Sequence, residues 1–345
     1  MLETRESDGE TVITSTGCFL LLLTLPFWLV IVAILGLYEK IFGNAGSASD
    51  SVKSPLRNGL SEETIRRRQK RLIQKIDLVP GEFWDTEVQY TVTEIPKRSG
   101  GTRTLSIPSE PLKATQRRLA KALQAEFGRR VHKTANAYIK GRNTITNAVP
   151  HLGCTVLIKL DIKDFFPSVT RGMIQPIISD FAFREPKAIE RILDICFTDK
   201  GLPQGAPTSP ILSNLVLRDF DIAAYRLANL MSATYTRYAD DLTFSLEEDD
   251  PAAVRKIVGA VRSMLAEQGF ELNEKSNKLN ILRGHQAQQI CGITLNSGKP
   301  TISRKQRRMV RAARHAIENG RLASMSLGAV EGWESYLRYV EQRYN

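Results

Sequence analysis

The feature that most constrains this chain is a pair of adjacent aspartates, Asp240 and Asp241, set between two strand-like runs. Residues 235–238 are aromatic or β-branched apart from one arginine, and apolar residues alternate with hydroxyl-bearing ones over 242–246. This pattern predicts two strands joined by a tight acidic turn, with both carboxylates at one edge of a sheet. Because adjacent aspartates are also common in ordinary turns, the pair alone does not identify a site.

A third carboxylate belongs with this pair. Residues 155–160 form a nearly continuous apolar run that predicts a strand buried on both faces, and this run ends at Asp161. Carboxylate oxygens from neighbouring strand ends suit hard divalent cations such as Mg²⁺, which complete their coordination with substrate phosphates. Two such ions about 3.5 to 4 Å apart can activate an attacking hydroxyl and stabilise a leaving oxygen. We therefore expect Asp161, Asp240 and Asp241 to be catalytic and to bind metal.

Three blocks of sequence resemble, in their order and spacing, signature blocks of reverse transcriptases. They are Asp-Ile-Lys-Asp-Phe-Phe at 161–166, Gly-Leu-Pro-Gln-Gly-Ala-Pro-Thr-Ser-Pro at 201–210 and Tyr-Ala-Asp-Asp at 238–241. The phrase Tyr-Thr-Arg-Tyr-Ala-Asp-Asp at 235–241 and Asn-Ala-Val-Pro-His at 147–151 make the chain most similar to bacterial retron reverse transcriptases. The resemblance extends from about residue 61 to about residue 300.

The resemblance implies an RNA-directed DNA polymerase, a nucleotidyltransferase that joins a primer 3′-hydroxyl to a dNTP. It implies the right-hand polymerase fold of the α/β (α+β) class, with fingers, palm and a short thumb. Two Mg²⁺ ions would be held by Asp161, Asp240 and Asp241, together with the backbone carbonyl of Ile162. The partners would be a dedicated structured RNA as template and primer, its DNA product and dNTPs. The setting would be antiphage defence, with a toxin or effector protein encoded nearby.

A glycine-containing hairpin is predicted over residues 94–105, with cationic residues at its tip. Taken alone, it is a generic hairpin. By resemblance to the fingers hairpin of reverse transcriptases, Lys97 and Arg103 would bind the triphosphate of the nucleotide. The planar fork of arginine suits bidentate contact with phosphate.

Three further substrate-binding residues rest on the resemblance. Phe166 matches the aromatic steric gate that excludes a ribose 2′-hydroxyl, and a core phenylalanine beside Phe165 is the alternative. Gln204 would project from its proline-rich loop toward the nucleotide. Lys275 stands where the family keeps a lysine near the leaving pyrophosphate, and Lys278 is the alternate candidate. An ordinary surface lysine is the other interpretation of Lys275.

The element at 147–151 admits two interpretations. Asn147 and His151 either have structural roles or, by resemblance, lie near template RNA. Further along the chain, Ile-Cys-Gly at 290–292 occupies the place where retron enzymes usually carry Val-Thr-Gly. The match to that group is therefore incomplete at this point.

The charge balance favours an anionic partner, because the 345 residues carry a formal net charge of +11. Basic residues cluster over 113–142 and in a predicted helix at 303–320, which suits a thumb that grips duplex phosphates. A helix predicted from Ser61 is also basic over 66–71, where its side chains form a solvated face or contact lipid or nucleic acid. The four cysteines lack paired metal-ligand spacing, so no zinc site is predicted.

Residues 18–38 contain no charged side chain. At 1.5 Å per residue, a helix of this length covers about 30 Å of hydrocarbon, so a membrane-spanning helix is the first interpretation. A cleaved signal peptide, opposed by the acidic leading segment, and a buried core helix are the alternatives. Basic residues follow this segment, while only Arg5 precedes it. The positive-inside rule therefore predicts a single-pass membrane protein with its N-terminus outside, its catalytic body cytoplasmic and lipid as a partner. The resemblance to bacterial enzymes implies that this membrane is the bacterial inner membrane.

The predicted organisation consists of segments with distinct composition. They are an acidic tail (1–17), a transmembrane helix (18–38), a flexible linker (39–60), fingers (61–155), palm (156–300) and thumb (301–345). Two rival functions accompany the retron-like polymerase. One is a non-retron defence reverse transcriptase with untemplated or protein-primed synthesis. The other is a non-catalytic RNA-binding membrane scaffold built on a polymerase fold.

Overall fold

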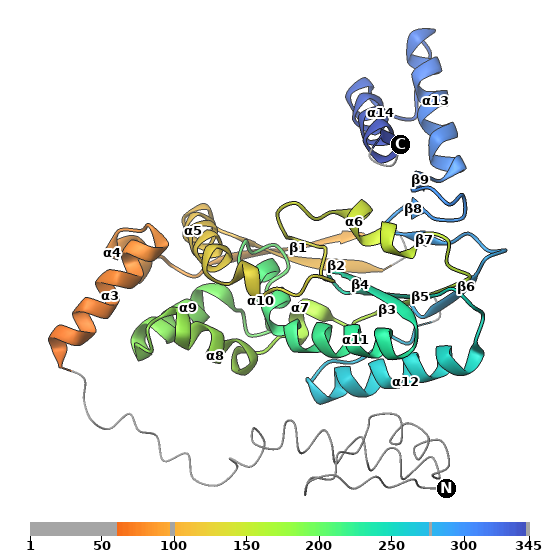
Figure 1. Cartoon of the computed structure of the whole chain (residues 1–345). Coiled ribbons are helices and arrows are strands. Elements are labelled where there is room, and N and C mark those ends of the chain that lie inside the picture. The colour runs from red at the N-terminus through yellow and green to blue at the C-terminus, as the bar shows by residue number, and fades with distance from the viewer. Residues whose placement is uncertain (1–60, 97–100, 276–277, 343–345) are drawn as a thin grey trace, which may run out of the picture. The chain divides into compact units, whose positions relative to one another are not determined.

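The computed structural model describes residues 61–96, 101–275 and 278–342 (Figure 1). The helices of the first half are α3 (Glu62–Ile76), α4 (Pro80–Trp84), α5 (Glu110–Phe127), η1 (Gly128–Arg130), α6 (Thr144–Ala148), η2 (Val149–His151) and α7 (Phe165–Ser168). Those that follow are α8 (Arg171–Phe181), α9 (Pro186–Cys196), α10 (Ser209–Val216), α11 (Arg218–Leu230), α12 (Pro251–Glu267), α13 (Arg304–Glu318) and α14 (Leu327–Gln342). The strands are β1 (Tyr90–Pro96), β2 (Thr102–Pro108), β3 (Val156–Asp161), β4 (Ala233–Tyr238), β5 (Asp241–Leu246), β6 (Asn280–Arg283), β7 (Gln289–Ile290), β8 (Ile293–Thr294) and β9 (Thr301–Ile302).

The central sheet is antiparallel, with strand order β4-β5-β3-β6. The predicted strand pair around the acidic turn is confirmed as β4 and β5, and β3 ends at Asp161 as expected. Leu157 and Ile158 point to opposite faces of β3 and belong to different hydrophobic clusters. The sheet is therefore covered on both sides, which explains why β3 is apolar almost throughout.

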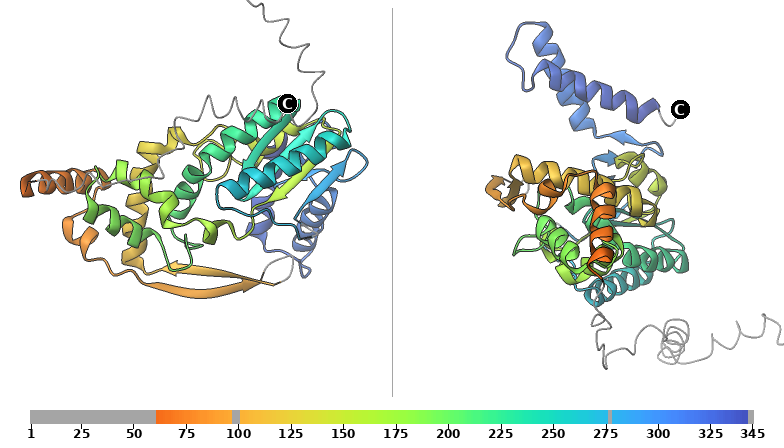
Figure 2. Two further views of the ribbon diagram at one scale, coloured as in Figure 1. Left: turned by 90° about the horizontal axis from the view of Figure 1, so that it is seen from below. Right: turned by 90° about the vertical axis from the view of Figure 1, so that its left-hand side faces the viewer.

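Helices α11 and α12 lie side by side on one face of this sheet (Figures 1 and 2). Helix α12 buries an apolar stripe of Val254, Ile257, Val261 and Leu265. Asp250 caps this helix, because its carboxylate accepts hydrogen bonds from the backbone N–H groups of residues 252 and 253. Together with α8, α9 and α10, these helices enclose the main hydrophobic core.

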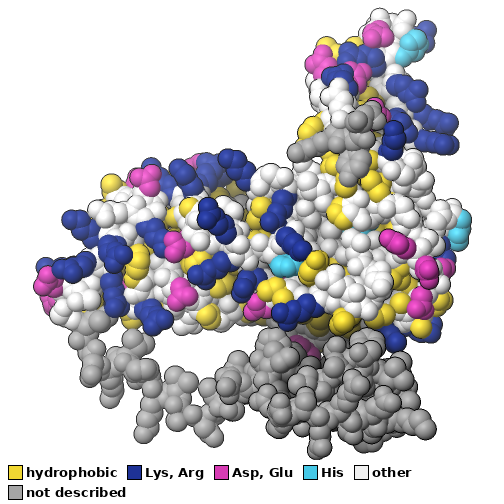
Figure 3. Space-filling view, in the orientation of Figure 1, with side chains coloured by type: hydrophobic (Ala, Val, Ile, Leu, Met, Phe, Trp, Pro, Cys, Tyr) yellow, Lys and Arg dark blue, Asp and Glu magenta, His cyan; other side chains and the backbone are white. Residues whose placement is uncertain are grey.

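The opposite face of the sheet is covered by α6, η2 and the small sheet β7-β8-β9. Helices α13 and α14 follow β9 and pack against each other through Val310, Ala313 and Val330 (Figure 1). The predicted basic helix is confirmed as α13, which Ser303 caps through the backbone N–H of residue 306. Lys and Arg side chains gather along α13 and near α3 and α5 on the face shown in Figure 3.

The hairpin predicted over 94–105 is confirmed as β1 and β2, with Pro96 opposite Thr102 next to the turn. Both strands are largely exposed to solvent. Ser106 ties the hairpin to the body, since its N–H donates to the carbonyl of Gln204 at 2.8 Å. Because an isolated two-stranded hairpin is marginal in water, this contact helps to hold β2 against the loop that carries Gln204.

The predicted membrane localisation requires a correction. No helix within residues 61–96, 101–275 and 278–342 is long and apolar enough to cross a membrane. Even α5, with 18 residues, carries Lys113, Arg117, Arg118 and Lys121 along its length. On this finding, the predicted placement in the bacterial inner membrane is wrong, and a lipid partner has no support. Residues 18–38, the predicted span, lie outside the described residues, as do the predicted tail and linker.

Candidate active site

The structure brings the three predicted aspartates to one end of the central sheet. Asp161, the last residue of β3, is the Cα partner of Asp241, the first residue of β5. The N–H of Ile162 donates to the carbonyl of Asp240 at 3.0 Å, which joins the two strand ends beyond the regular ladder. The end of β3 and the turn before β5, which lie about 80 positions apart in the sequence, therefore meet at one place.

The turn between β4 and β5 is tight, with only Ala239 and Asp240 between the paired residues Tyr238 and Asp241. Ala239 has a φ of +59°, a left-handed conformation that this position of a two-residue hairpin turn normally gives to glycine. An alanine in this conformation is strained, and such strain persists only when the surroundings hold it in place. The turn that carries the acids is therefore held by contacts outside itself.

Negative charge is concentrated at this end of the sheet. Burial and the nearby carboxylates of Asp241 and Asp161 raise the pKa of Asp240 to about 6. Asp241 is exposed, yet the surrounding protein still desolvates its carboxyl enough to raise its pKa, and Asp161 adds to the rise. The ionised forms of neighbouring carboxylates repel each other, and a cation between them stabilises both ionised forms.

Asp161 already has cationic and polar partners in the protein. Its Oδ2 atom accepts from Lys278 Nζ at 2.5 Å, and its Oδ1 atom accepts from Asn273 Nδ2 at 2.8 Å. Among the described residues, no group of three or more His, Cys, Asp or Glu side chains is arranged to hold a metal ion. The donor set itself fits a hard divalent cation, because it consists of carboxylate oxygens whose mutual repulsion such a cation would relieve. Binding would require Lys278 to release or share Asp161.

The two candidate lysines are placed differently. Lys278, the alternate candidate, reaches the aspartates through its ion pair with Asp161. Lys275 is exposed, and its backbone N–H donates to Asn273 Oδ1 at 3.4 Å. The loop after α12 thus brings Lys278 to the acidic end of the sheet.

Phe166 lies in α7, directly after the Asp161 strand end, and is half-buried. Its neighbour Phe165 is the core residue, since it is 4% exposed and contacts the ring of Phe270. The Phe166 ring is 6.5 Å from the ring of Tyr138, which has a φ of +63° and is 49% exposed. Burial raises the pKa of Tyr138, and the charge of Asp240 adds to the rise. Tyr138 therefore belongs to this site, and the sequence contains no periodic signal that would have identified it.

The loop at 201–208 is fixed on both sides. A Cβ atom on Gly205, which has a φ of +123°, would lie 2.8 Å from the carbonyl oxygen of Ser106 in β2. A Cβ atom on Gly201 would lie 2.3 Å from the carbonyl oxygen of Pro167. Glycine is therefore required at both positions, and the loop presents the half-buried Gln204 next to the β1–β2 hairpin.

The cationic hairpin residues are placed only in part. Arg103 is exposed in β2, opposite Ile95, and its charge lowers the pKa of Tyr138 against the rise caused by burial, so Arg103 lies near Tyr138. Lys97 lies outside the described residues.

His151 and Asn147 are buried behind the β4–β5 hairpin. His151 is 1% exposed, with Nδ1 2.7 Å from Ser245 Oγ and Nε2 2.8 Å from Thr236 Oγ1. Burial lowers the pKa of His151 to about 3, so the ring is neutral at ordinary pH. Asn147 is fully buried and donates to Cys291 Sγ at 3.7 Å. Both side chains fit the structural interpretation, because neither is accessible to RNA.

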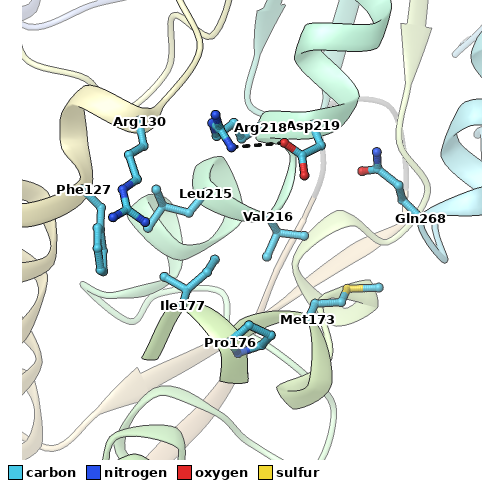
Figure 4. A pocket seen from close by; sticks show the side chains of 10 residues that line it. All are labelled: Phe127, Arg130, Met173, Pro176, Ile177, Leu215, Val216, Arg218, Asp219 and Gln268. Atoms are coloured by element: carbon cyan, nitrogen blue, oxygen red, sulfur yellow. Dashed lines mark hydrogen bonds and ion pairs between the residues drawn. The ribbon is translucent and has the colours of Figure 1, made fainter. Parts of the chain in front are cut away.

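A cavity of about 440 Å³ lies away from the aspartates, among η1, α8, α10 and α11 (Figure 4). Phe127, Met173 and Ile177 line it with apolar surface, and Arg218 pairs with Asp219 at 3.3 Å on its rim. No residue predicted to bind metal or substrate lines this cavity. The cavity is therefore separate from the residues that meet at the end of the sheet.

Comparison with known proteins assigns a family to this arrangement. Residues 95–295 match the model described as "Reverse transcriptase (RNA-dependent DNA polymerase)". The retron Mx65 reverse transcriptase of Myxococcus xanthus is 39% identical over 268 residues, which cover 73% of this chain and 61% of the relative. The retron Mx162 reverse transcriptase of the same organism is 32% identical over 262 residues, covering 68% and 53%. The retron Ec86 reverse transcriptase of Escherichia coli is 27% identical over 267 residues, covering 76% and 79%.

The resemblance to retron reverse transcriptases read from the motifs is confirmed by these relatives. The chain spans 61% and 53% of the lengths of the two Myxococcus proteins. The matched region includes every described strand from β2 to β8, and with them the aspartates and the loop that carries Gln204.

Proposed function

The chain belongs to the reverse transcriptase family, and from this premise we propose that it is a retron-like RNA-directed DNA polymerase. It would extend a primer 3′-hydroxyl with dNTPs, copying a dedicated structured RNA into DNA. The observation that carries the proposal is the meeting of Asp161 with Asp240 and Asp241 at one end of the sheet, inside the region that matches the family.

We propose that Asp161, Asp240 and Asp241, with the carbonyl of Ile162, hold two Mg²⁺ ions. When bound, such ions act as Lewis acids toward the attacking and leaving oxygens of phosphoryl transfer. The protein contributes acidic groups that are already close together, since burial and then the nearby carboxylates of Asp241 and Asp161 raise the pKa of Asp240.

The nucleotide site is proposed to combine the hairpin and the loop that it contacts. Arg103 and Lys97 would bind the triphosphate, and Gln204 would position the nucleotide from the neighbouring loop. The hydrogen bond from Ser106 to the Gln204 carbonyl supports this assignment, because it holds the two elements in one register. Phe166 would exclude a ribose 2′-hydroxyl, and its half-exposed ring is available for that contact.

A lysine is proposed to protonate the leaving pyrophosphate, since a positioned ammonium can act as a general acid. The sequence favoured Lys275 for this role. The ion pair with Asp161 supports Lys278 instead, because that ammonium already lies among the acids.

We propose that the described parts correspond to fingers at 61–155, palm at 156–300 and thumb at 301–345. The palm would then contain the sheet β4-β5-β3-β6, and the thumb would contain α13 and α14. The exposed arginines of α13 would contact the phosphates of the template–primer duplex, which predicts binding that weakens with salt.

The deciding experiment is primer extension by the purified full chain on an RNA template, with dNTPs and Mg²⁺. Asp240→Asn combined with Asp241→Asn should reduce the incorporation rate at least about 100-fold, since these carboxylates act on the transferring phosphate. Asp194→Asn is the matched control, because this exposed aspartate pairs with Arg171 on α8 and α9, away from the sheet end. Unchanged incorporation by the double variant would refute the site.

The rival functions give different outcomes in the same preparation. RNA binding without any incorporation by the wild-type chain would favour the non-catalytic scaffold. Sequencing the DNA made in cells distinguishes the two polymerase readings, because a retron-like enzyme yields one discrete product copied from one RNA. Heterogeneous or untemplated DNA would favour the non-retron alternative.

A further inference from the structure

Behind the acidic turn lies an ion pair that is completely buried. Arg237 in β4 and Asp221 in α11 both have side chains that are 0% exposed. The guanidinium makes a bidentate contact, with Nε 2.8 Å from Asp221 Oδ1 and Nη2 2.6 Å from Asp221 Oδ2. Burial alone would lower the pKa of Arg237, but the charge and hydrogen bonds of Asp221 raise it above the ordinary value, so the guanidinium stays charged.

The third nitrogen of Arg237 points at the turn that carries the acids. Nη1 donates to the carbonyl of Ala239 at 3.0 Å and to Asn214 Oδ1 at 3.0 Å. Ala239 is the residue in the strained left-handed conformation, and Asp240 follows it directly. The guanidinium therefore supplies the outside contact that such a turn requires.

The same side-chain network reaches a second part of the site. Asn214 donates from Nδ2 to the carbonyl of Ala137 at 3.0 Å, and the backbone of Arg237 pairs with residues 134 and 136. Tyr138, next to Phe166, follows this segment. Asp221, Arg237 and Asn214 thus connect the acidic turn to the loop that carries Tyr138.

Stability alone does not account for a charged pair at this place. Removing two charges from water is costly, and a buried ion pair can often be replaced by packed apolar residues with no loss of stability. An apolar pair, however, has no donor for the Ala239 carbonyl. Lysine has three donors on a single nitrogen, so it cannot reproduce the four hydrogen bonds that the planar guanidinium directs to Asp221, Asn214 and Ala239.

We propose that Arg237, oriented by Asp221, is a positioning residue that sets the Ala239–Asp240 turn and thereby places the Asp240 and Asp241 carboxylates for metal and nucleotide. This inference rests on the proposed polymerase function for its catalytic consequence. Its structural consequence, the ability of the turn to bind a divalent cation, can be measured separately.

The test compares Arg237→Lys with Tyr235→Phe in the full chain. Tyr235 is a matched control, because its hydroxyl donates to the same Asp221 Oδ1 at 2.8 Å, is equally buried and does not contact the turn. Four quantities are measured: the single-nucleotide incorporation rate, Mn²⁺ binding by calorimetry, RNA affinity and the melting temperature. Rates and affinities are measured below each variant's melting temperature and are normalised to the concentration of folded protein.

Arg237→Lys should lose about 10- to 100-fold in both incorporation rate and Mn²⁺ affinity, as expected for residues that orient metal ligands. Tyr235→Phe should keep both, and both variants should bind RNA like the wild type. Wild-type rate and Mn²⁺ affinity in folded Arg237→Lys would overturn the proposal. An equal loss in Tyr235→Phe would also overturn it, because the effect would then come from the buried network in general.

If Arg237→Lys does not fold, a second variant tests the positioning role of Arg237. Arg237→Met combined with Asp221→Leu replaces the ion pair by apolar side chains, which is often neutral for stability. Loss of rate and Mn²⁺ affinity in this folded variant supports the proposal, and wild-type values overturn it. If the wild-type chain incorporates no nucleotide, the proposed function fails, while the comparison of Mn²⁺ affinities still decides the role of Arg237.

Discussion

The buried side chain of His151 makes the free energy of unfolding depend on pH, and the size of the effect follows from its pKa in the folded chain. The ring bridges β4 and β5 from behind, with one nitrogen near Thr236 of β4 and the other near Ser245 of β5. Both nitrogens are engaged by hydroxyl groups and the ring is 1% exposed, so a second proton would be buried without a counter-charge. Burial accordingly lowers the pKa of His151 from 6.5 to about 3.

The sign and size of the effect follow from that shift. In the unfolded chain His151 takes up a proton below its ordinary pKa of 6.5, whereas in the folded chain it does so only near 3. Protons therefore bind the unfolded state preferentially, and the free energy of unfolding falls as pH decreases through the window between these values. At about 1.4 kcal/mol per pH unit, lowering the pH from about 8 to about 5 should remove roughly 2 kcal/mol through this residue.

The assay is urea unfolding at both pH values for the wild type and His151→Gln. Glutamine cannot titrate, so the variant lacks this contribution. At about pH 8 it should be less stable by about 1 to 3 kcal/mol, the cost of disturbed buried hydrogen bonds. At about pH 5 the difference should shrink by roughly 2 kcal/mol, because only the wild type has been destabilised through position 151. His285→Gln, on an exposed loop, controls for the substitution itself.

One result would refute this reasoning. If the difference between the wild type and His151→Gln is the same at both pH values, His151 binds its proton equally well in the folded and unfolded chain. The ring would then not be the neutral bridge between β4 and β5.

Three further predictions concern the acidic end of the sheet and its loops. Gly205→Ala should destabilise the protein by at least about 1 kcal/mol more than Gly153→Ala in urea unfolding, because only at Gly205 would a Cβ meet a backbone oxygen, at 2.8 Å. Lys278→Met should tighten Mn²⁺ binding in calorimetry and slow incorporation, because it frees Asp161; weaker binding would contradict this. Phe166→Ala should raise ribonucleotide relative to deoxynucleotide incorporation, and an unchanged ratio would exclude the gate role.

The parts of the fold that sequence could predict are those set by local periodicity. The continuous apolar run before Asp161 became β3, and the alternation after Asp241 became β5. The basic helix predicted over 303–320 became α13, which spans Arg304–Glu318. In each case the apolar residues of one element indicate which of its positions are buried, so the neighbouring elements did not have to be known.

Other parts of the site depend on contacts between distant segments. From the sequence alone, an arginine in a strand is expected at the protein surface. Arg237 can be buried only because Asp221 in α11 pairs with it. Tyr138 lies in a loop without periodicity, and its place beside Phe166 follows from the pairing of residues 134 and 136 with Arg237 in β4. The choice of Lys278 over Lys275 was likewise undetermined, because an irregular loop has no repeat that says which side chain faces inward.

Two cations contact the acidic end of the sheet, Arg237 at the turn and Lys278 at Asp161, and they differ in how easily they can be displaced. Arg237 is fully buried and makes directed contacts with Asp221 and Ala239, so removing it would leave an unpaired charge in the interior. The Lys278 side chain is 37% exposed, long and flexible, so water can replace Asp161 as the partner of its ammonium group at little cost. Arg237 therefore fixes the backbone of the acidic turn, while the cation that pairs with Asp161 can be exchanged. A divalent cation that competes with Lys278 needs only to displace an ammonium, and the turn need not rearrange to receive it.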